Sequence, residues 1–136
     1  MAYQILIIDD DPLFRQFMRA LLVDAGHDVL EADNGRLGIE IYESQTPELV
    51  ITDLVMPEQE GLQTIRILAE ASLKPKIIAI SGGIDILRGG SSDTEEWLEI
   101  AAEFGADAVM EKPISPDHFV ATVAAVLKAE KVARKE

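Results

Sequence analysis

Residues 3–12 read YQILIIDDDP and join a predicted strand to a predicted helix. The run from Tyr3 to Ile8 is almost wholly apolar, which is typical of a parallel strand covered on both faces. Three aspartates end the run. The third, Asp11, suits a helix N-cap, and Pro12 fits the first helical position because it needs no hydrogen-bond donor there. The stretch therefore predicts a buried strand whose carboxyl end leads directly into a helix.

The same succession of a short apolar run and an amphipathic segment occurs five times along the chain. Besides the first, the predicted strands are 28–32, 49–52, 76–80 and 108–111. Alternating strands and helices favour right-handed crossovers and a parallel sheet with helices on both faces. We therefore expect an α/β fold, a doubly wound, flavodoxin-like (βα)5 domain with a five-stranded parallel sheet, and we take for it the common strand order 2-1-3-4-5.

Turn and capping residues mark the ends of the predicted helices. Gly26 ends the first helix and Pro47 closes the second unit. The helix before the fifth strand is expected to begin at Ser92 or Asp93 and to end at Gly105.

The composition limits the function classes. With 136 residues the chain has room for one domain, which we assign to 1–128, and 129–136 form a helix end or tail. An excess of 25 acidic over 12 basic residues argues against nucleic acid as a partner, which needs a basic surface. The absence of cysteine excludes disulfides and thiolate chemistry. No apolar run reaches the ~18 residues of a membrane span and no signal peptide is recognisable, so we expect no membrane partner and a cytoplasmic location.

The ligand site of an open parallel sheet lies beyond the carboxyl ends of its strands, where the strand order switches. The residues at those ends are Asp9, Asp10, Asp53, Ser81 and Lys112. Because the first and third strands are neighbours in the expected order, three carboxylates converge, and they repel one another unless a cation joins them. Carboxylate oxygens favour a hard ion such as Mg²⁺.

A lysine and a serine beside this predicted metal site add one positive charge and one hydrogen-bond donor, which suit an incoming phosphoryl group. An aspartate is the expected nucleophile, since the chain has no cysteine and neither His27 nor His118 lies at a strand end. The residues thus predict phosphoryl transfer to an aspartate.

The chain closely resembles the response-regulator receiver domain of two-component signalling over nearly its whole length. The resemblance rests on three motifs taken together: the pair Asp9-Asp10, the sequence DLVMPEQEG over 53–61, and Lys112-Pro113. Their combination is much more specific than any one of them. It implies a stand-alone response regulator that catalyses its own phosphorylation and slow dephosphorylation and is not otherwise an enzyme.

The resemblance also implies a role for each residue of the site. Asp53 is the phosphoacceptor. The implied Mg²⁺ ligands are Asp9, Asp10, Asp53 and the backbone carbonyl of Val55. Ser81, followed by Gly82, takes the position of the family's switch hydroxyl, and Lys112 contacts the phosphoryl group. Pro113 is expected to follow a cis peptide bond.

The implied phosphodonor is a sensor histidine kinase or a histidine phosphotransfer protein, and a downstream protein, which the sequence does not identify, reads the conformational change. The chain departs from the family at Val109, where an aromatic residue is usual, and in a longer stretch over 82–93. We name Trp97 and Val109 as the candidate output surface and leave a homodimer open. Val55 and Gly83 offer no polar side chain to orient a water, so we expect a long-lived phosphoryl group.

The best alternative is a phosphatase similar to the haloacid-dehalogenase type, with Asp9 as nucleophile and Asp11 as acid. Against it, Leu13 stands where that family has Thr or Val, and Asp53 would have no role. A nucleotide-binding module is less well supported, because neither phosphate-loop motif occurs. A degenerate receiver that acts only as a scaffold is the third alternative.

Overall fold

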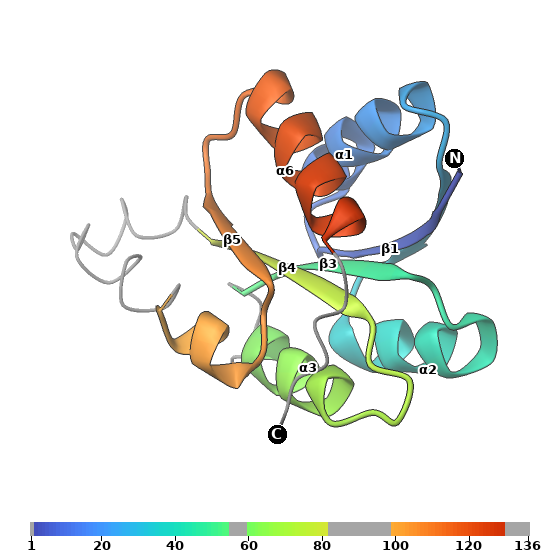
Figure 1. Cartoon of the computed structure of the whole chain (residues 1–136), viewed down its shortest axis with the longest axis vertical. Coiled ribbons are helices and arrows are strands. Elements are labelled where there is room, and N and C mark those ends of the chain that lie inside the picture. The colour runs from blue at the N-terminus through green and yellow to red at the C-terminus, as the bar shows by residue number, and fades with distance from the viewer. Residues whose placement is uncertain (1, 55–59, 82–98, 130–136) are drawn as a thin grey trace.

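A computed structural model describes residues 2–54, 60–81 and 99–129. These residues form three layers, with a central sheet between two layers of helices (Figure 1). The strands are β1 Gln4–Ile8, β2 Asp28–Ala32, β3 Leu49–Asp53, β4 Lys76–Ser81 and β5 Ala108–Glu111. The helices are α1 Pro12–Asp24, α2 Gly35–Gln45, α3 Glu60–Ala69 and α6 Pro116–Lys128, and residues 99–104 are also helical.

All strand pairs are parallel, and the order is β2-β1-β3-β4-β5, which confirms the predicted fold class. The register pairs Ile8 with Thr52 and Asp53 with Ile80. It also pairs Ser81 with Glu111. The carboxyl ends of β1, β3, β4 and β5 therefore meet at one edge of the sheet.

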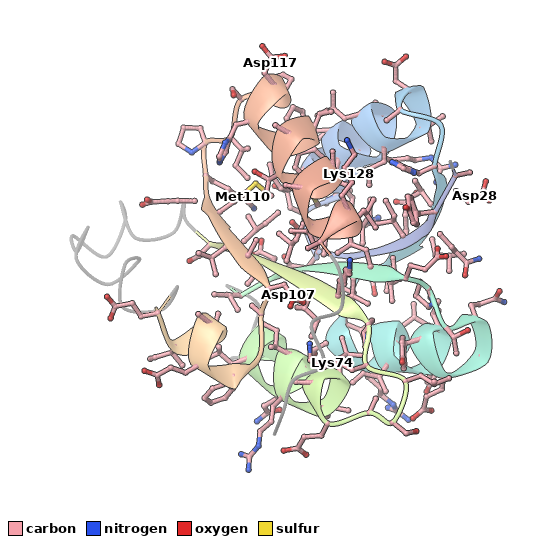
Figure 2. The ribbon with its side chains drawn as sticks, viewed as in Figure 1. Asp28, Lys74, Asp107, Met110, Asp117 and Lys128 are labelled. Atoms are coloured by element: carbon pink, nitrogen blue, oxygen red, sulfur yellow. The ribbon has the colours of Figure 1, made fainter. Side chains whose placement is uncertain are left out.

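The core has two parts because successive side chains of a strand point to opposite faces of the sheet. Ile5 and Ile7 pack on the side of α1 and α6, whereas Leu6 and Ile8 pack on the side of α2 and α3. Met110 of β5 belongs to the first part, near α6 (Figure 2). All four residues of β1 from Ile5 on are fully buried, and full burial of such a side chain stabilises the fold by roughly 1.5–3 kcal/mol.

The helix ends carry the capping residues that the sequence predicts. The Asp11 carboxylate accepts hydrogen bonds from the backbone N–H of Leu13 at 3.0 Å and of Phe14 at 3.4 Å. Gly26 and Gly105 have φ values of 95° and 126°, a conformation that glycine adopts without strain. None of the described helices is long and apolar enough to cross a membrane.

The structure differs from the predicted strand boundaries at three places. Strand β1 begins at Gln4 rather than Tyr3. Strands β3 and β4 each extend one residue further, because Asp53 and Ser81 still pair with their neighbouring strands. Helix α2 ends at Gln45, which agrees with Pro47 closing this unit, and Thr46 takes a left-handed conformation with φ 45°. The predicted start of a helix at Ser92 or Asp93 lies outside the described residues.

Candidate functional site

Three aspartates gather at the carboxyl edge of the sheet. Asp9 and Asp10 follow β1, and Asp53 is the last residue of the neighbouring strand β3. One carboxylate oxygen of each lies within 4.8 Å of the others. The three side chains that the strand order was expected to bring together are therefore close neighbours.

These carboxylates lie in different environments. Asp9 is fully buried and Asp53 is 4% exposed, whereas Asp10 is exposed. Oδ1 of Asp9 accepts a hydrogen bond from the backbone N–H of Asp11 at 2.8 Å, but Oδ2 has no hydrogen-bond partner among the described residues. Burial, and then the charge of Asp53, raise the pKa of Asp9 to about 7. A buried carboxylate of this kind needs a cation to stabilise its charge.

Lys112 brings a positive charge to the same edge. Its Nζ lies 3.0 Å from Oδ2 of Asp53 and 3.7 Å from Oδ2 of Asp9. Burial disfavours the ammonium, but the two carboxylates outweigh it and raise the pKa of Lys112 above its ordinary value. The formal charge of three carboxylates and one ammonium is −3 + 1 = −2, which matches a divalent cation.

Ser81 ends β4 beside these groups. Its side chain is fully buried, and its Oγ has no hydrogen-bond partner within the described part of the chain. The carbonyl of Ser81 accepts a hydrogen bond of 2.7 Å from the backbone N–H of Lys112. A backbone hydrogen bond therefore links Ser81, which carries the hydroxyl, to Lys112, which carries the ammonium.

Gly61 has a steric role that the motif alone did not reveal. A Cβ at this position would lie 2.3 Å from the backbone oxygen of Asp53 and 2.7 Å from Cα of Leu54. Such distances are far shorter than van der Waals contact, so α3 can begin this close to Asp53 only with a glycine. The spacing from Asp53 to Gly61 thus reflects packing as well as chemistry.

Two residues of α1 that the sequence indicated only as helix residues also reach the site. Nη1 of Arg15 donates a 2.8 Å hydrogen bond to the backbone oxygen of Asp9, and its Nε binds Glu31 at 3.1 Å. The ring of Phe14 has Nζ of Lys112 above it, 4.1 Å from its centroid. No sequence signal links Phe14 to Lys112, because they lie on elements that only the tertiary fold brings together.

The remaining residues of the predicted site divide into two groups. The Lys112–Pro113 peptide is cis, and Val109 is 36% exposed on β5. Val55, Gly82 and Trp97 lie outside the described residues.

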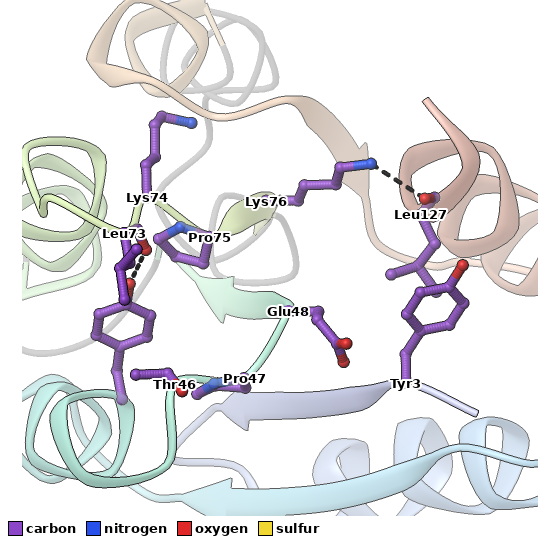
Figure 3. A pocket seen from close by; sticks show the side chains of 10 residues that line it. Tyr3, Thr46, Pro47, Glu48, Leu73, Lys74, Pro75, Lys76 and Leu127 are labelled. Carbon is purple, nitrogen blue, oxygen red and sulfur yellow. Dashed lines mark hydrogen bonds between the residues drawn. The ribbon is translucent and has the colours of Figure 1, made fainter. Parts of the chain in front are cut away.

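A hollow of about 320 Å³ lies at the opposite end of the sheet (Figure 3). Its two lysines, Lys74 and Lys76, are engaged within the protein. Nζ of Lys76 donates to the backbone carbonyls of Val126 and Leu127 at 2.8 and 3.0 Å, at the carboxyl end of α6. Lys74 lies 3.7 Å from Asp107 (Figure 2). These contacts give the hollow a structural role, which leaves the acidic edge as the candidate site.

Comparison with known proteins agrees with this geometry. The response regulator receiver domain model matches residues 5–124. The chain is 33% identical over 118 residues to the chemotaxis protein CheY of Bacillus subtilis, covering 82% of this chain and 94% of that protein. It is 33% identical over 127 residues to protein PilH of Pseudomonas aeruginosa, covering 91% and 97%.

The fold has solved counterparts. The structure of the chemotaxis response regulator CheY4 of Vibrio cholerae superposes with a TM-score of 0.78 at 22% identity, covering 93% of this chain and 99% of that one. Relatives of this kind are response regulators of two-component systems, and their receiver domains are signalling domains rather than ordinary enzymes. The chain belongs to the response regulator receiver domain family.

Proposed function

We propose that this protein is a response regulator that accepts a phosphoryl group on the carboxylate of Asp53, from a phosphohistidine of a partner kinase or phosphotransfer protein. The observation that carries the proposal is the site itself: Asp53 lies 3.0 Å from the Lys112 ammonium, within a cluster of three carboxylates. This arrangement combines a nucleophile with charges suited to a phosphoryl group.

The donor set fits Mg²⁺. Asp9, Asp10 and Asp53 would hold the ion, and the resemblance adds the backbone carbonyl of Val55. The support is the buried Oδ2 of Asp9, which has no hydrogen-bond partner among the described residues, together with a donor set made of oxygen alone. When bound, the ion neutralises negative charge on the phosphoryl oxygens and the carboxylates.

The protein's own groups supply the rest of the reaction. A carboxylate oxygen of Asp53 forms the new bond to phosphorus, while the bond from phosphorus to the donor imidazole nitrogen breaks and its electron pair stays on the imidazole. The Lys112 ammonium stabilises the phosphoryl oxygens. The Ser81 hydroxyl, which is buried without a hydrogen-bond partner in the described structure, supplies a further donor.

Signalling follows from the added charge. A phosphoryl group on Asp53 brings new acceptor oxygens into a site where Lys112 and Ser81 are the neighbouring donors. Because the backbone N–H of Lys112 binds the carbonyl of Ser81, both residues respond together. The ends of β4 and β5 are thereby biased toward a second conformation, and a partner protein reads the surface near Val109 and Trp97.

The test is direct phosphorylation. The protein is incubated with Mg²⁺ and acetyl phosphate, and intact mass followed by peptide mapping locates the modification. We expect one phosphoryl group on Asp53, with none on the Asp53→Asn variant and a greatly reduced rate after removal of Mg²⁺ with EDTA. Labelling of another side chain, or undiminished labelling of Asp53→Asn, would reject the proposal.

The phosphatase alternative is disfavoured by the position of Asp11. Its carboxylate caps α1 by accepting hydrogen bonds from the backbone N–H of Leu13 and Phe14, so it is engaged in the helix terminus rather than held ready as an acid. That alternative also assigns no role to Asp53. A phosphatase of this kind would retain turnover in Asp53→Asn, which release of inorganic phosphate from acetyl phosphate by that variant would detect.

A further inference from the structure

We propose that Phe14 is a positioning residue for phosphoryl transfer: the face of its ring holds the ammonium of Lys112 beside the carboxylates of Asp53 and Asp9. The inference rests on the proposed function, because it concerns how Lys112 is held ready for the phosphoryl group. It assigns a role in the site to a side chain that otherwise belongs to the core.

Three groups from three elements surround the ammonium. Nζ of Lys112 is 3.0 Å from Oδ2 of Asp53, 3.7 Å from Oδ2 of Asp9 and 4.1 Å from the centroid of the Phe14 ring. A ring face attracts a cation within about 6 Å of its centroid, and more strongly where water is excluded. The Lys112 side chain is only 17% exposed, so the contact lies in such a place.

A ring is a suitable partner because it attracts positive charge without accepting a conventional hydrogen bond. Lys112 has a long flexible stem and three N–H donors, and an ammonium is strongly hydrated in solution. A carbonyl or carboxylate in place of Phe14 would hold one of those donors in a fixed direction. The ring leaves all three donors to the oxygens, so the ammonium can turn from the Asp53 carboxylate to an arriving phosphoryl oxygen while staying in the site.

The Phe14 ring is itself fixed by the core. It stacks on Phe17 with a centroid distance of 5.4 Å and an interplanar angle of 29°. Phe17 in turn lies 6.2 Å from the ring of Phe119, which is fully buried on α6. This row of rings joins α1 and α6 beneath the site, so the ring over Lys112 is held in place before any phosphoryl group arrives.

The kinetic test compares variants of Phe14 with a control variant at Leu22, a buried core residue near the other end of α1. Phosphorylation of Asp53 by acetyl phosphate with Mg²⁺ is followed by intact mass. We expect Phe14→Leu to slow the reaction roughly three- to tenfold and Phe14→Tyr, which keeps a ring face, to stay within about twofold of the natural protein. Leu22→Val trims core packing of the same helix at a residue outside the row of rings, and we expect a change within about twofold.

A fluorination series separates electrostatics from packing. Mono-, di- and trifluorophenylalanine at position 14 nearly preserve the ring's shape and progressively weaken its attraction for a cation. We expect the logarithm of the rate to fall stepwise along the series. A flat series, or equal slowing by Phe14→Leu and Leu22→Val, would show that Phe14 contributes packing alone. If Phe14→Leu does not fold, the fluorinated series still shows whether the Phe14 ring acts through its attraction for the ammonium or through packing alone.

A second readout needs no phosphorylation. A ring face 4.1 Å from Nζ shifts the ε-methylene protons of Lys112 upfield in the NMR spectrum. We expect this shift in the natural protein and in Leu22→Val and its loss in Phe14→Leu; its absence from the natural protein would overturn the inference. If the shift is present but Asp53 accepts no phosphate, the proposed function is wrong, and the positioning role is rejected with it.

Discussion

Among single residues, Asp9 has an environment that opposes its own charge. It is fully buried, and Oδ2 lacks a hydrogen bond among the described residues. Burial and the neighbouring Asp53 raise its pKa to about 7 from 3.8. The folded state therefore binds a proton at Asp9 more tightly than the unfolded chain does, and the sign of the pH effect follows from this difference.

The stability of the metal-free protein is expected to depend on pH through Asp9. The stabilising contribution of its proton is fully present below the unfolded value of 3.8 and is lost as the pH rises to about 7. Because asparagine cannot ionise, Asp9→Asn should not lose stability as the pH rises. At pH 8 in EDTA we expect its free energy of unfolding to exceed that of the natural protein by on the order of 1–2 kcal/mol. Urea denaturation at pH 5 and pH 8 measures the effect. A variant less stable than the natural protein at pH 8 would contradict it.

Gly61 sets the distance between α3 and Asp53, the proposed phosphoacceptor. In Gly61→Ala the new Cβ would meet the backbone oxygen of Asp53 at 2.3 Å, and backbone moves less readily than a side chain. We expect a loss of about 1–3 kcal/mol in the free energy of unfolding, together with slower phosphorylation of Asp53. Gly38→Ala is the matched control, because there the Cβ meets the side-chain end of Ile8. Equal losses in both variants would count against this reasoning.

Among the elements, α1 and α6 are each stabilised at their amino ends by a side-chain cap and a proline. Asp11 caps α1, and Ser115 caps α6 by accepting a hydrogen bond from the backbone N–H of His118 at 3.1 Å. The caps resemble each other in chemistry but differ in place, since Asp11 adjoins the acidic cluster. Comparing variants of Asp11 and Ser115 therefore distinguishes the structural role of a helix cap from a role in the reaction.

Loss of either cap should lower stability by a similar amount. We expect Asp11→Ala and Ser115→Ala each to reduce the free energy of unfolding by about 1 kcal/mol, because each leaves helix N–H groups without their side-chain acceptor. Phosphorylation of Asp53 in Asp11→Ala should stay within about threefold of the natural rate, a difference of roughly 0.7 kcal/mol. Urea denaturation and the acetyl phosphate assay measure the two effects. Complete loss of phosphorylation in Asp11→Ala would show that Asp11 takes part in the reaction.

The carboxyl end of α6 depends on a lysine from another element. Lys76 at the start of β4 donates to the carbonyls of Val126 and Leu127, and a cation there also complements the helix dipole. Lys76→Met should reduce the free energy of unfolding by about 1–2 kcal/mol. Lys128→Met, on the exposed last turn of the same helix, should change it by less than about 0.5 kcal/mol. Equal effects in thermal or urea denaturation would contradict a specific cap.

For the whole molecule, the proposed binding of an ion at the acidic cluster would couple to folding. Asp9 and Asp10 follow β1, whereas Asp53 ends β3 more than 40 residues further along the chain, so the cluster exists only in the folded state. An ion that binds the folded state alone stabilises it against global unfolding. The same linkage makes stability a measure of the metal site that is independent of phosphorylation.

Added Mg²⁺ is therefore expected to raise the unfolding midpoint. At ten times the dissociation constant the gain is about 1.4 kcal/mol. Asp9→Asn and Asp10→Asn should lose most of this gain, whereas Asp117→Asn, on α6 outside the cluster, should keep it. The measurement is urea denaturation across a Mg²⁺ titration at constant ionic strength. An equal gain in all variants would indicate a non-specific effect of the salt.

The sequence by itself determined the strands, most helix ends and the fold class, because these follow from local patterns: apolar runs, helical spacing, caps and glycines. It also predicted the convergence of Asp9, Asp10 and Asp53, because the common order of a five-stranded sheet of this kind makes the first and third strands neighbours. The left-handed conformation of Thr46, just after α2, was not predictable, because a β-branched residue rarely adopts it.

Only the tertiary structure decided the finer arrangement of the site. The burial of Asp9, the contact of Gly61 with the backbone of Asp53, and the placing of the Phe14 ring against Lys112 depend on distances between side chains and backbone of different elements. Phe14 and Lys112 are almost a hundred residues apart. Local sequence patterns do not indicate such contacts. The contacts arise from the packing of distant elements, and packing depends on the shapes of all the side chains together.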